Sequence, residues 1–224
     1  MSFIRLEKIN KIYPPYFRAL VNINLEIEKG DFLLITGPTG AGKTTLLKLI
    51  YREEKPSHGE IFIKNKPYSK IKEKEFRKLR QRWGIIFQDG KLFEDLSVYE
   101  NIKLSLVLAE KKMRDMKHRI YEFLERFNLL LKINKKIKEL SGGEQQKVGV
   151  IRAILKDPEF LIADEPTGNL DPMSIYEIIN ILKELHQKGT TIVLATHDPT
   201  ILNLKIGKLI TLEKGELIEG CYFL

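Results

Sequence analysis

The sequence predicts an α/β fold built around a largely parallel sheet. Short, almost wholly apolar stretches bounded by glycine or charge indicate strands that are buried on both faces. Between several of them apolar residues recur at helical spacing, and strands that alternate with helices are typical of the α/β class. The strand stretches are DFLLIT, GEIFI, WGIIF, EFLIAD and TTIVLAT, which begin at residues 31, 59, 83, 159 and 190.

One helix is predicted after Pro172, where the apolar residues lie on a single face. Gly189 predicts its end, just before TTIVLAT. The apolar face is formed by Ile175, Ile178, Leu182 and Leu185.

Between about residues 90 and 140 the strand signal disappears, and helical spacing replaces it. We therefore expect a helical insert in the sheet domain, with an apolar stripe that belongs to the core. The stripe consists of Ile120, Phe123, Leu124, Phe127 and Leu131.

Length and composition predict one compact domain. The chain has 224 residues, 43% of them hydrophobic, which is enough for a sizeable core. It contains neither an apolar run long enough to span a bilayer nor an apolar leader at its start, so we expect a soluble, unexported protein. The one cysteine, Cys221, excludes an internal disulfide and favours a reducing compartment.

The net charge of +8 is compatible with nucleotide phosphates, nucleic acid or an anionic membrane face. Much of the excess comes from residues 64–82, where Glu73 and Glu75 interrupt a run of Lys and Arg. This run is either a solvated face or a patch that faces a membrane or a partner. It lacks the interleaved aromatics of a surface that stacks single-stranded bases.

A phosphate-binding loop follows the first predicted strand of the sheet. GPTGAGKT fits the pattern G-x-x-x-x-G-K-[ST], with a strand before it and the helical stretch KTTLLKLI after it. Its glycines let backbone NH groups converge on phosphate, Lys43 reaches the β and γ phosphates, and Thr44 ligates Mg²⁺. We expect nucleotide contacts from Gly37, Pro38, Thr39, Gly40, Ala41, Gly42, Lys43, Thr44 and Thr45.

A pair of acids ends the predicted strand EFLIAD. Asp164 would lie beside the Mg²⁺, and Glu165 would accept a proton from an attacking water. A carboxylate aimed at water favours hydrolysis over transfer to a second substrate.

Two further polar residues follow predicted strands that end at the same edge of the sheet. His197, after TTIVLAT, is expected to contact the γ-phosphate. Gln88, after WGIIF, can offer an amide oxygen to Mg²⁺ or to the water.

A second glycine-rich stretch, SGGE, has the S-x-x-E spacing of a capping box at a helix start. Such a start still presents NH groups, a positive dipole and the Ser141 hydroxyl to an anion. It lacks the lysine and the metal ligand that a phosphate site needs, which Lys43 and Asp164 provide elsewhere.

Together these elements resemble the ATP-binding cassette (ABC) ATPases. LSGGEQQ is similar to the family signature, and it is accompanied in family order by GPTGAGKTT, Gln88, FLIADE, GNLD and THD. The resemblance implies a P-loop NTPase, RecA-like core of the ABC ATPase type, with an antiparallel β subdomain and an inserted helical subdomain. Residues 1–89 and 158–224 would form the nucleotide-binding core with the β subdomain, and residues 90–157 the helical subdomain.

By position, the resemblance also implies ATP and Mg²⁺ as ligands. Tyr13 would stack on adenine, and residues 169–171, Asn169 to Asp171, would contact the opposite subunit of a dimer. The signature would close over the γ-phosphate held by the partner subunit, through Ser141, Gly142, Gly143 and Glu144. The catalytic set would be Glu165, His197 and Gln88, the metal ligands Thr44, Gln88 and Asp164, and Asp171 would join the nucleotide contacts.

Within the family, DEPTGNLD resembles a branch that holds cell-division, lipoprotein-releasing and macrolide-export ATPases, and FQDGKLFEDLSVYENI is most similar to the cell-division group. That implies a homodimer on ATP binding, peripheral at the cytoplasmic face of the inner membrane, with a permease-like membrane partner and a role in cell-wall hydrolase control. The alternative is a lipoprotein-releasing or macrolide-export ATPase. Nucleic acid is not an expected partner. Ile151 and Lys147 depart from the family pattern and concern helix packing alone.

Overall fold

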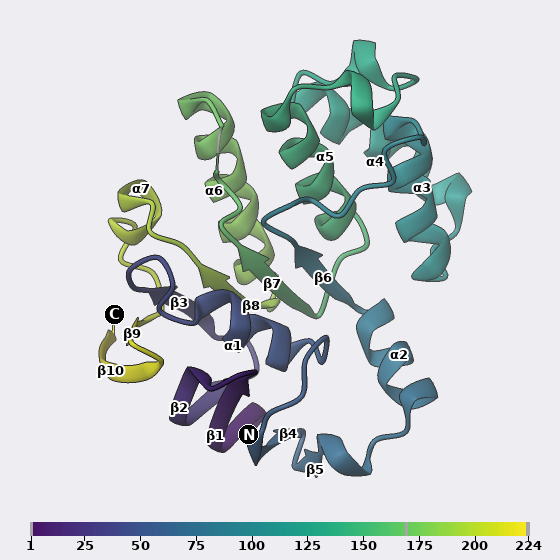
Figure 1. The fold of residues 1–224 in the computed structure, drawn as a ribbon. Coiled ribbons are helices and arrows are strands. Elements are labelled where there is room, and N and C mark those ends of the chain that lie inside the picture. Colours follow the sequence, from purple (N-terminus) through teal and green to yellow (C-terminus); the bar gives the residue numbers. More distant parts are fainter. Residues whose placement is uncertain (1, 169, 223–224) are drawn as a thin grey trace.

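The computed structural model describes residues 2–168 and 170–222, and a six-stranded sheet lies at its centre (Figure 1). In space the strands follow the order β10-β9-β3-β8-β7-β6. All pairings are parallel except that of β10 with β9. The predicted α/β class is confirmed. The strands are β3 (Phe32–Thr36), β6 (Trp83–Ile86), β7 (Phe160–Asp164), β8 (Thr191–Ala195), β9 (Lys208–Glu213) and β10 (Glu216–Tyr222).

The central strands β3, β7 and β8 are apolar at every position but one, because both faces of the sheet are covered. In β3, Phe32 and Leu34 belong to one hydrophobic cluster, while Leu33 and Ile35 belong to the other. Successive side chains of a strand point to opposite faces, so a strand with two buried faces needs apolar residues throughout. This is why the sequence shows uninterrupted apolar runs here.

A second, antiparallel sheet has the order β2-β1-β4-β5. It includes GEIFI, so the assignment of that stretch to the parallel sheet was wrong. Burial in this strand alternates, with Ile61 and Ile63 buried and Phe62 partly exposed, because only one face packs on the core. The two longest strands were not predicted, since charged residues and bulges interrupt their patterns. The strands are β1 (Ser2–Tyr13), β2 (Phe17–Glu28), β4 (His58–Ile63) and β5 (Lys66–Pro67).

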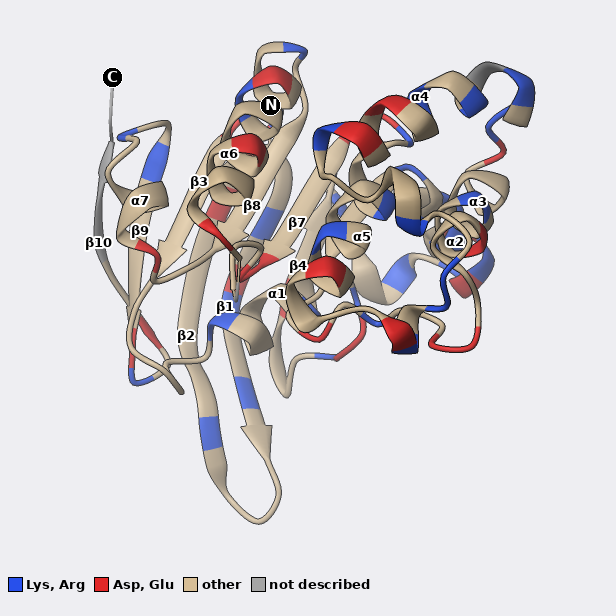
Figure 2. Ribbon diagram, turned by 90° about the horizontal axis from the view of Figure 1, so that it is seen from above, with Lys and Arg blue, Asp and Glu red and all other residues tan. Residues whose placement is uncertain are grey.

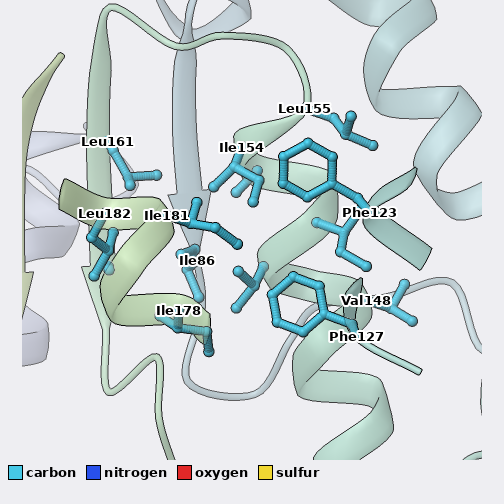
Figure 3. Packing of buried hydrophobic residues seen from close by; sticks show 14 of the residues in the cluster. Ile86, Phe123, Phe127, Val148, Ile154, Leu155, Leu161, Ile178, Ile181 and Leu182 are labelled. Atoms are coloured by element: carbon cyan, nitrogen blue, oxygen red, sulfur yellow. The ribbon is translucent and has the colours of Figure 1, made fainter. Parts of the chain in front are cut away.

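The antiparallel sheet packs on one face of the central sheet together with α1 (Lys43–Ile50) and Phe76 of α2 (Glu73–Gln81), and α3, α4, α5 and α6 pack on the other face (Figure 1). Figure 3 shows Phe123, Phe127 and Val148 packed in one cluster with Ile86 and Leu161 of the sheet, so the helical insert shares the sheet's core. The helices are α1 (Lys43–Ile50), η1 (Tyr68–Lys70), α2 (Glu73–Gln81), α3 (Val98–Leu108), α4 (Met113–Arg126), η2 (Leu130–Lys132), η3 (Ile137–Glu139), α5 (Gly142–Ile154), α6 (Pro172–Gln187) and α7 (Pro199–Leu202).

The apolar stripe predicted near residue 120 is buried except at its last member. Ile120, Phe123, Leu124 and Phe127 lie in the core, whereas Leu131 is 98% exposed. The assignment of Leu131 was wrong because α4 ends at Arg126 and the positive φ of Asn128 breaks the helical period.

The helix predicted after Pro172 is confirmed. Asp171 caps α6, since the Ser174 backbone N–H donates to its carboxylate at 2.9 Å. Gly189, at φ 90°, follows the helix in the left-handed conformation that ends many helices. No helix in the part of the chain that the structure describes is long and apolar enough to cross a membrane.

The basic run of residues 64–82 forms part of the outer surface, where α2 buries only Phe76. Its two acids pair with bases of the same run, Glu75 with Lys66 at 2.8 Å and Glu73 with Arg80 at 3.0 Å. Figure 2 shows similarly mixed charges along α4. The run therefore keeps an excess of positive charge at the surface.

Candidate active site

The phosphate-binding loop lies between the end of β3 and the start of α1, and two of its glycines, Gly37 and Gly42, cannot be replaced without displacing neighbours. Gly37 has φ 144°, and a Cβ there would lie 2.0 Å from the Leu212 carbonyl oxygen. Gly42 has φ 105°, and its Cβ would lie 2.5 Å from the Ala19 carbonyl oxygen. The loop can approach these strands this closely only without side chains.

Lys43 begins α1, and its ammonium group folds back across the loop. Its Nζ donates to the carbonyl oxygens of Gly37 at 2.7 Å and Pro38 at 3.1 Å. The residue is only 9% exposed, so these carbonyls satisfy a charge that water reaches poorly. A nucleotide phosphate at this loop would offer the same donors a full negative charge.

Asp164, the last residue of β7, is buried beside Thr44 on α1. Burial raises the pKa of the Asp164 carboxyl, an effect that a hydrogen bond with Thr44 opposes. Asp164, Thr44 and Gln88 line the same two neighbouring clefts. A carboxylate, a hydroxyl and an amide oxygen are the hard oxygen ligands that suit Mg²⁺, so the residues present fit this ion.

Glu165 follows Asp164 and is held by the end of β8. Its backbone, at φ 47°, turns the side chain away from that of Asp164, and its N–H donates to Ala195 O at 2.9 Å. His197 Nδ1 lies 2.7 Å from one carboxylate oxygen of Glu165, and the Thr196 hydroxyl donates to the other at 3.0 Å. The Glu165 side chain is 14% exposed, whereas the His197 side chain is 76% exposed. Glu165 therefore lies in the wall of the adjacent cleft, and His197 lies at the rim of that cleft.

A cleft of about 260 Å³ joins these groups. It brings together predicted residues from the loop, the two acids, Gln88 and His197. It also includes Phe17 and Ala19 of β2, which sequence reasoning did not select. The lining residues are Phe17, Ala19, Thr39, Gly40, Gly42, Lys43, Thr44, Thr45, Gln88, Asp164, Glu165 and His197.

Tyr13 is not among the residues that line this cleft. It pairs with Phe17 across the tip of the β1–β2 hairpin, and its ring lies under the Lys11 ammonium at 4.8 Å. Phe17 is 60% exposed at the cleft, so it is the aromatic residue next to the phosphate loop in this structure. In the sequence, the signal for Phe17 was that it is an aromatic residue close to Tyr13.

The predicted capping box at SGGE is confirmed. The Glu144 N–H donates to Ser141 Oγ at 3.4 Å, and the Ser141 N–H donates to Glu144 Oε2 at 3.0 Å. Lys132 forms an ion pair with Glu144 and, by its hydrogen bond, lowers the pKa of that carboxyl. The negative charge of Glu144 is therefore balanced by Lys132. The positive end of the α5 helix dipole stays available to an anion.

Within one chain the signature residues do not reach the phosphate cleft. Ser141 and Gly142 are exposed, and Gly142 lines an adjoining cleft of about 350 Å³, which shares Gln88, Glu165 and His197 with the phosphate cleft. Neither Ser141, Gly143 nor Glu144 lines the cleft around Lys43.

Gln146, the last residue of the signature, and the adjacent Lys147 connect α5 to the segment that follows β7. Buried Gln146 donates from Nε2 to Pro166 O at 3.2 Å and Glu165 O at 3.4 Å. Lys147 pairs with Asp171 at 3.2 Å. Sequence reasoning did not assign these contacts, because the residues are close only in the folded chain. Asn169, next to this loop, lies outside the described residues.

The fold and the cleft define a phosphate-loop nucleoside triphosphatase. The family model described as ABC transporter matches residues 20–168. The chain therefore belongs to the ABC transporter ATP-binding family, as the sequence motifs predict, and it hydrolyses ATP to ADP and phosphate. A model for an AAA domain, described as putative AbiEii toxin of a type IV toxin–antitoxin system, matches the shorter stretch 136–203.

Characterised relatives agree with this assignment. The chain is 41% identical to the cell division ATP-binding protein FtsE of Bacillus subtilis (strain 168), over 96% of this chain and 95% of the relative. It is 38% identical to FtsE of Escherichia coli (strain K12), over 97% and 98%. A solved structure titled a dimeric structure of MJ0796, a bacterial ABC transporter cassette, matches with a TM-score of 0.90 at 33% identity, over 99% of each chain. The MJ0796 cassette bound to ADP and Pi matches with a TM-score of 0.89.

Proposed function

We propose that this chain is the ATPase subunit of an FtsE-like complex, which acts with an FtsX-like membrane partner in bacterial cell division and the control of cell-wall hydrolases. Support comes from 41% and 38% identity to relatives named as cell division ATP-binding proteins, across nearly the full length of each chain. The protein would sit peripherally on the cytoplasmic face of the inner membrane, through that partner.

The observation that carries the proposal is that the two glycine-rich elements, the phosphate-binding loop and the signature, lie apart from each other within one chain. Lys43 and Glu165 share one cleft, whereas Ser141 lies outside it in the same chain. In a dimer, the capped start of α5 from one copy would close over the γ-phosphate held by Lys43 of the other. ATP would then join two copies, and hydrolysis would release them.

The chemistry assigned to each side chain follows from its contacts. Glu165, held through both carboxylate oxygens, would take the proton of the attacking water. Gln88 would orient that water. Thr44, Gln88 and Asp164 would hold Mg²⁺, which when bound offsets the charge of the phosphates.

The neighbourhood of His197 adds a constraint. A carboxylate only accepts hydrogen bonds, so Nδ1 of His197 must carry a hydrogen and donate it in a hydrogen bond to Glu165. Nε2 of a neutral ring is then an acceptor and cannot donate to a phosphate oxygen. Donation to the γ-phosphate by a neutral ring therefore requires His197 to leave Glu165 and change its tautomer.

We further propose that residues 90–157 act as the helical subdomain and that residues 1–89 with 158–224 act as the nucleotide-binding core. The helices of the first segment carry Ser141 at their edge, while the second holds Lys43, Asp164 and Glu165. Movement of one against the other would bring signature and phosphate loop of opposite copies together.

The test is capture from native membranes with the Glu165→Gln variant in ATP and Mg²⁺. The expected result is recovery of a second copy of the chain together with an FtsX-like membrane protein. Recovery of a lipoprotein-extracting or macrolide-exporting permease instead would assign the chain to that branch. Absence of any membrane protein, with tight and salt-sensitive nucleic-acid binding, would contradict the proposal.

A further inference from the structure

The ion pair between Lys132 and Glu144 joins two elements that meet beside the signature. Lys132 is the last residue of η2, and its neighbours Leu130 and Ile133 pack against the hydrophobic core. Glu144 lies in the first turn of α5, directly after the two signature glycines. The core contacts on both sides of Lys132 therefore fix the position from which its side chain reaches Glu144.

The two oxygens of the Glu144 carboxylate have different partners. Oε2 accepts the Ser141 backbone N–H at 3.0 Å, which completes the capping box, and Oε1 accepts a hydrogen bond from the Lys132 ammonium group. A neutral glutamine could also complete a capping box at this position, because its side-chain oxygen accepts the same N–H. The cap therefore requires neither the negative charge of Glu144 nor the lysine that balances it.

The balance of charge at the start of α5 depends on this lysine. A helix dipole is equivalent to about +0.5 of an elementary charge at its N-terminus, whereas an ionised carboxylate carries a full negative charge. Without Lys132 the first turn of α5 would be negative overall, and with Lys132 it is positive. The side chains of Lys132 and Glu144 are 37% and 23% exposed, so water screens these charges only in part.

The proposed function brings a phosphate close to this pair. In a dimer, the start of α5 from one copy would close over the γ-phosphate held by Lys43 of the other. Each helical residue rises about 1.5 Å, so the Glu144 backbone lies within about 5 Å of the helix start along the axis. An unpaired carboxylate there would repel the phosphate, because like charges brought together at an interface oppose association.

We propose that Lys132 is a positioning residue of the two-copy ATP site: it acts through Glu144, whose charge it balances, so that the start of α5 can receive the γ-phosphate bound by the other copy. The inference rests on the proposed function, since it concerns the same composite site. Lys132 itself does not have to touch the nucleotide.

The test measures the association of purified Glu165→Gln chains in ATP and Mg²⁺ by sedimentation over a range of protein concentrations. Adding Lys132→Met should raise the dissociation constant of the ATP-bound dimer by about tenfold or more, because each composite site then contains an unpaired Glu144 carboxylate. Binding of a fluorescent ATP analogue to single copies should be unchanged, since Lys132 does not line the cleft around Lys43. Lys132→Arg keeps the charge and should associate like the parent.

A second substitution separates the effect of charge from damage to the structure. Glu144→Gln removes the negative charge and keeps an oxygen for the capping box. The double variant Lys132→Met with Glu144→Gln should therefore associate like the parent. In chains with an intact Glu165, the turnover lost through Lys132→Met should return as the protein concentration rises, because association alone is weakened. Cooperative thermal unfolding checks that each variant folds, and Lys132→Gln replaces Lys132→Met if the latter does not.

Lys138→Met is the matched control. Lys138 lies in η3, shortly before the signature, and pairs with Asp95 at 2.7 Å. These two side chains are 53% and 81% exposed, so water solvates the Asp95 carboxylate once the lysine is removed. ATP-driven association should not change in this variant.

The outcomes separate this inference from the proposed function. If Glu165→Gln chains associate with ATP and Lys132→Met leaves that association unchanged, the role of Lys132 is wrong and the proposed function is intact. If Lys132→Met weakens association and Glu144→Gln does not restore it, Lys132 does not act through Glu144, and the inference is again overturned. If Glu165→Gln chains do not associate with ATP at all, the two-copy site of the proposed function is overturned together with the inference.

Discussion

His197 Nδ1 lies 2.7 Å from Glu165 Oε1, and Thr196 donates to the second oxygen of the same carboxylate at 3.0 Å. Both contacts hold the Glu165 carboxylate in one orientation. Both donors come from the end of β8, so a strand next to β7 orients the carboxylate. The side chain is therefore held in place before any nucleotide arrives.

Glu165→Gln should keep ATP binding and lose hydrolysis. The amide preserves the size of the side chain but cannot take a proton, so the hydrolysis rate should fall by about 10²-fold or more. Steady-state phosphate release and sedimentation with ATP test this, and the variant should remain a closed dimer. Hydrolysis at the wild-type rate would contradict the assignment of the base.

Gln146→Leu should lower turnover more than it changes the KM for ATP. It removes the donor to the carbonyls of Glu165 and Pro166 and leaves the buried Pro166 oxygen unpaired, at a cost of about 1–3 kcal/mol. The Glu165 oxygen keeps the Gly168 N–H as a donor at 3.2 Å.

The adjacent Gln145→Leu is the matched control, because Gln145 donates to Ile137 O and Leu140 O, away from the acids. It should lower the thermal midpoint with little effect on turnover per folded molecule. Equal losses of turnover in the two variants would argue against a positioning role for Gln146.

Asp164→Asn should stabilise the nucleotide-free protein and abolish Mg²⁺-dependent hydrolysis. Burial raises the folded-state pKa of Asp164, so ionising it costs stability above its unfolded-state pKa, and the neutral amide avoids that cost. The gain in thermal midpoint should be present at pH 7 and vanish as pH falls below that unfolded pKa, about 3.9. A lower midpoint at pH 7 would contradict the predicted sign.

Mixing Lys43→Ala chains with Ser141→Arg chains tests the shared site. Each variant alone should be inactive, because both of its composite sites are damaged. A mixed dimer has one intact site and one doubly damaged site. Because about half of the dimers formed by random pairing are mixed, the mixture should regain measurable hydrolysis. As a control, one wild-type chain is linked in tandem to one variant chain, which leaves a single intact site in each dimer. If these linked dimers hydrolyse ATP while the mixture of the two variants does not, sharing of the site between copies is excluded.

The sequence was a sufficient guide wherever function depends on short, contiguous patterns. The phosphate loop, the acid pair after β7 and the capping box at Ser141 each depend on spacing within a few residues. The helix after Pro172 was predictable for the same reason, since its cap and its final glycine are local signals.

The errors occurred where long-range packing overrides local pattern. GEIFI has the composition of a buried strand, yet its pairing with β1 places it in the antiparallel sheet. Leu131 continues a helical period that the chain abandons at Asn128. Neither outcome can be predicted from the neighbouring residues, because each depends on which distant part of the chain the segment packs against.

The sequence by itself determined the family and the ATPase activity, and it predicted the residues that carry this activity, because all three depend on motifs whose spacing sets local geometry. Only the tertiary structure decided that Phe17, rather than Tyr13, lines the nucleotide cleft and that Gln146 reaches Glu165. Such contacts join residues that are far apart along the chain, and only the packing of sheets and helices brings them within bonding distance.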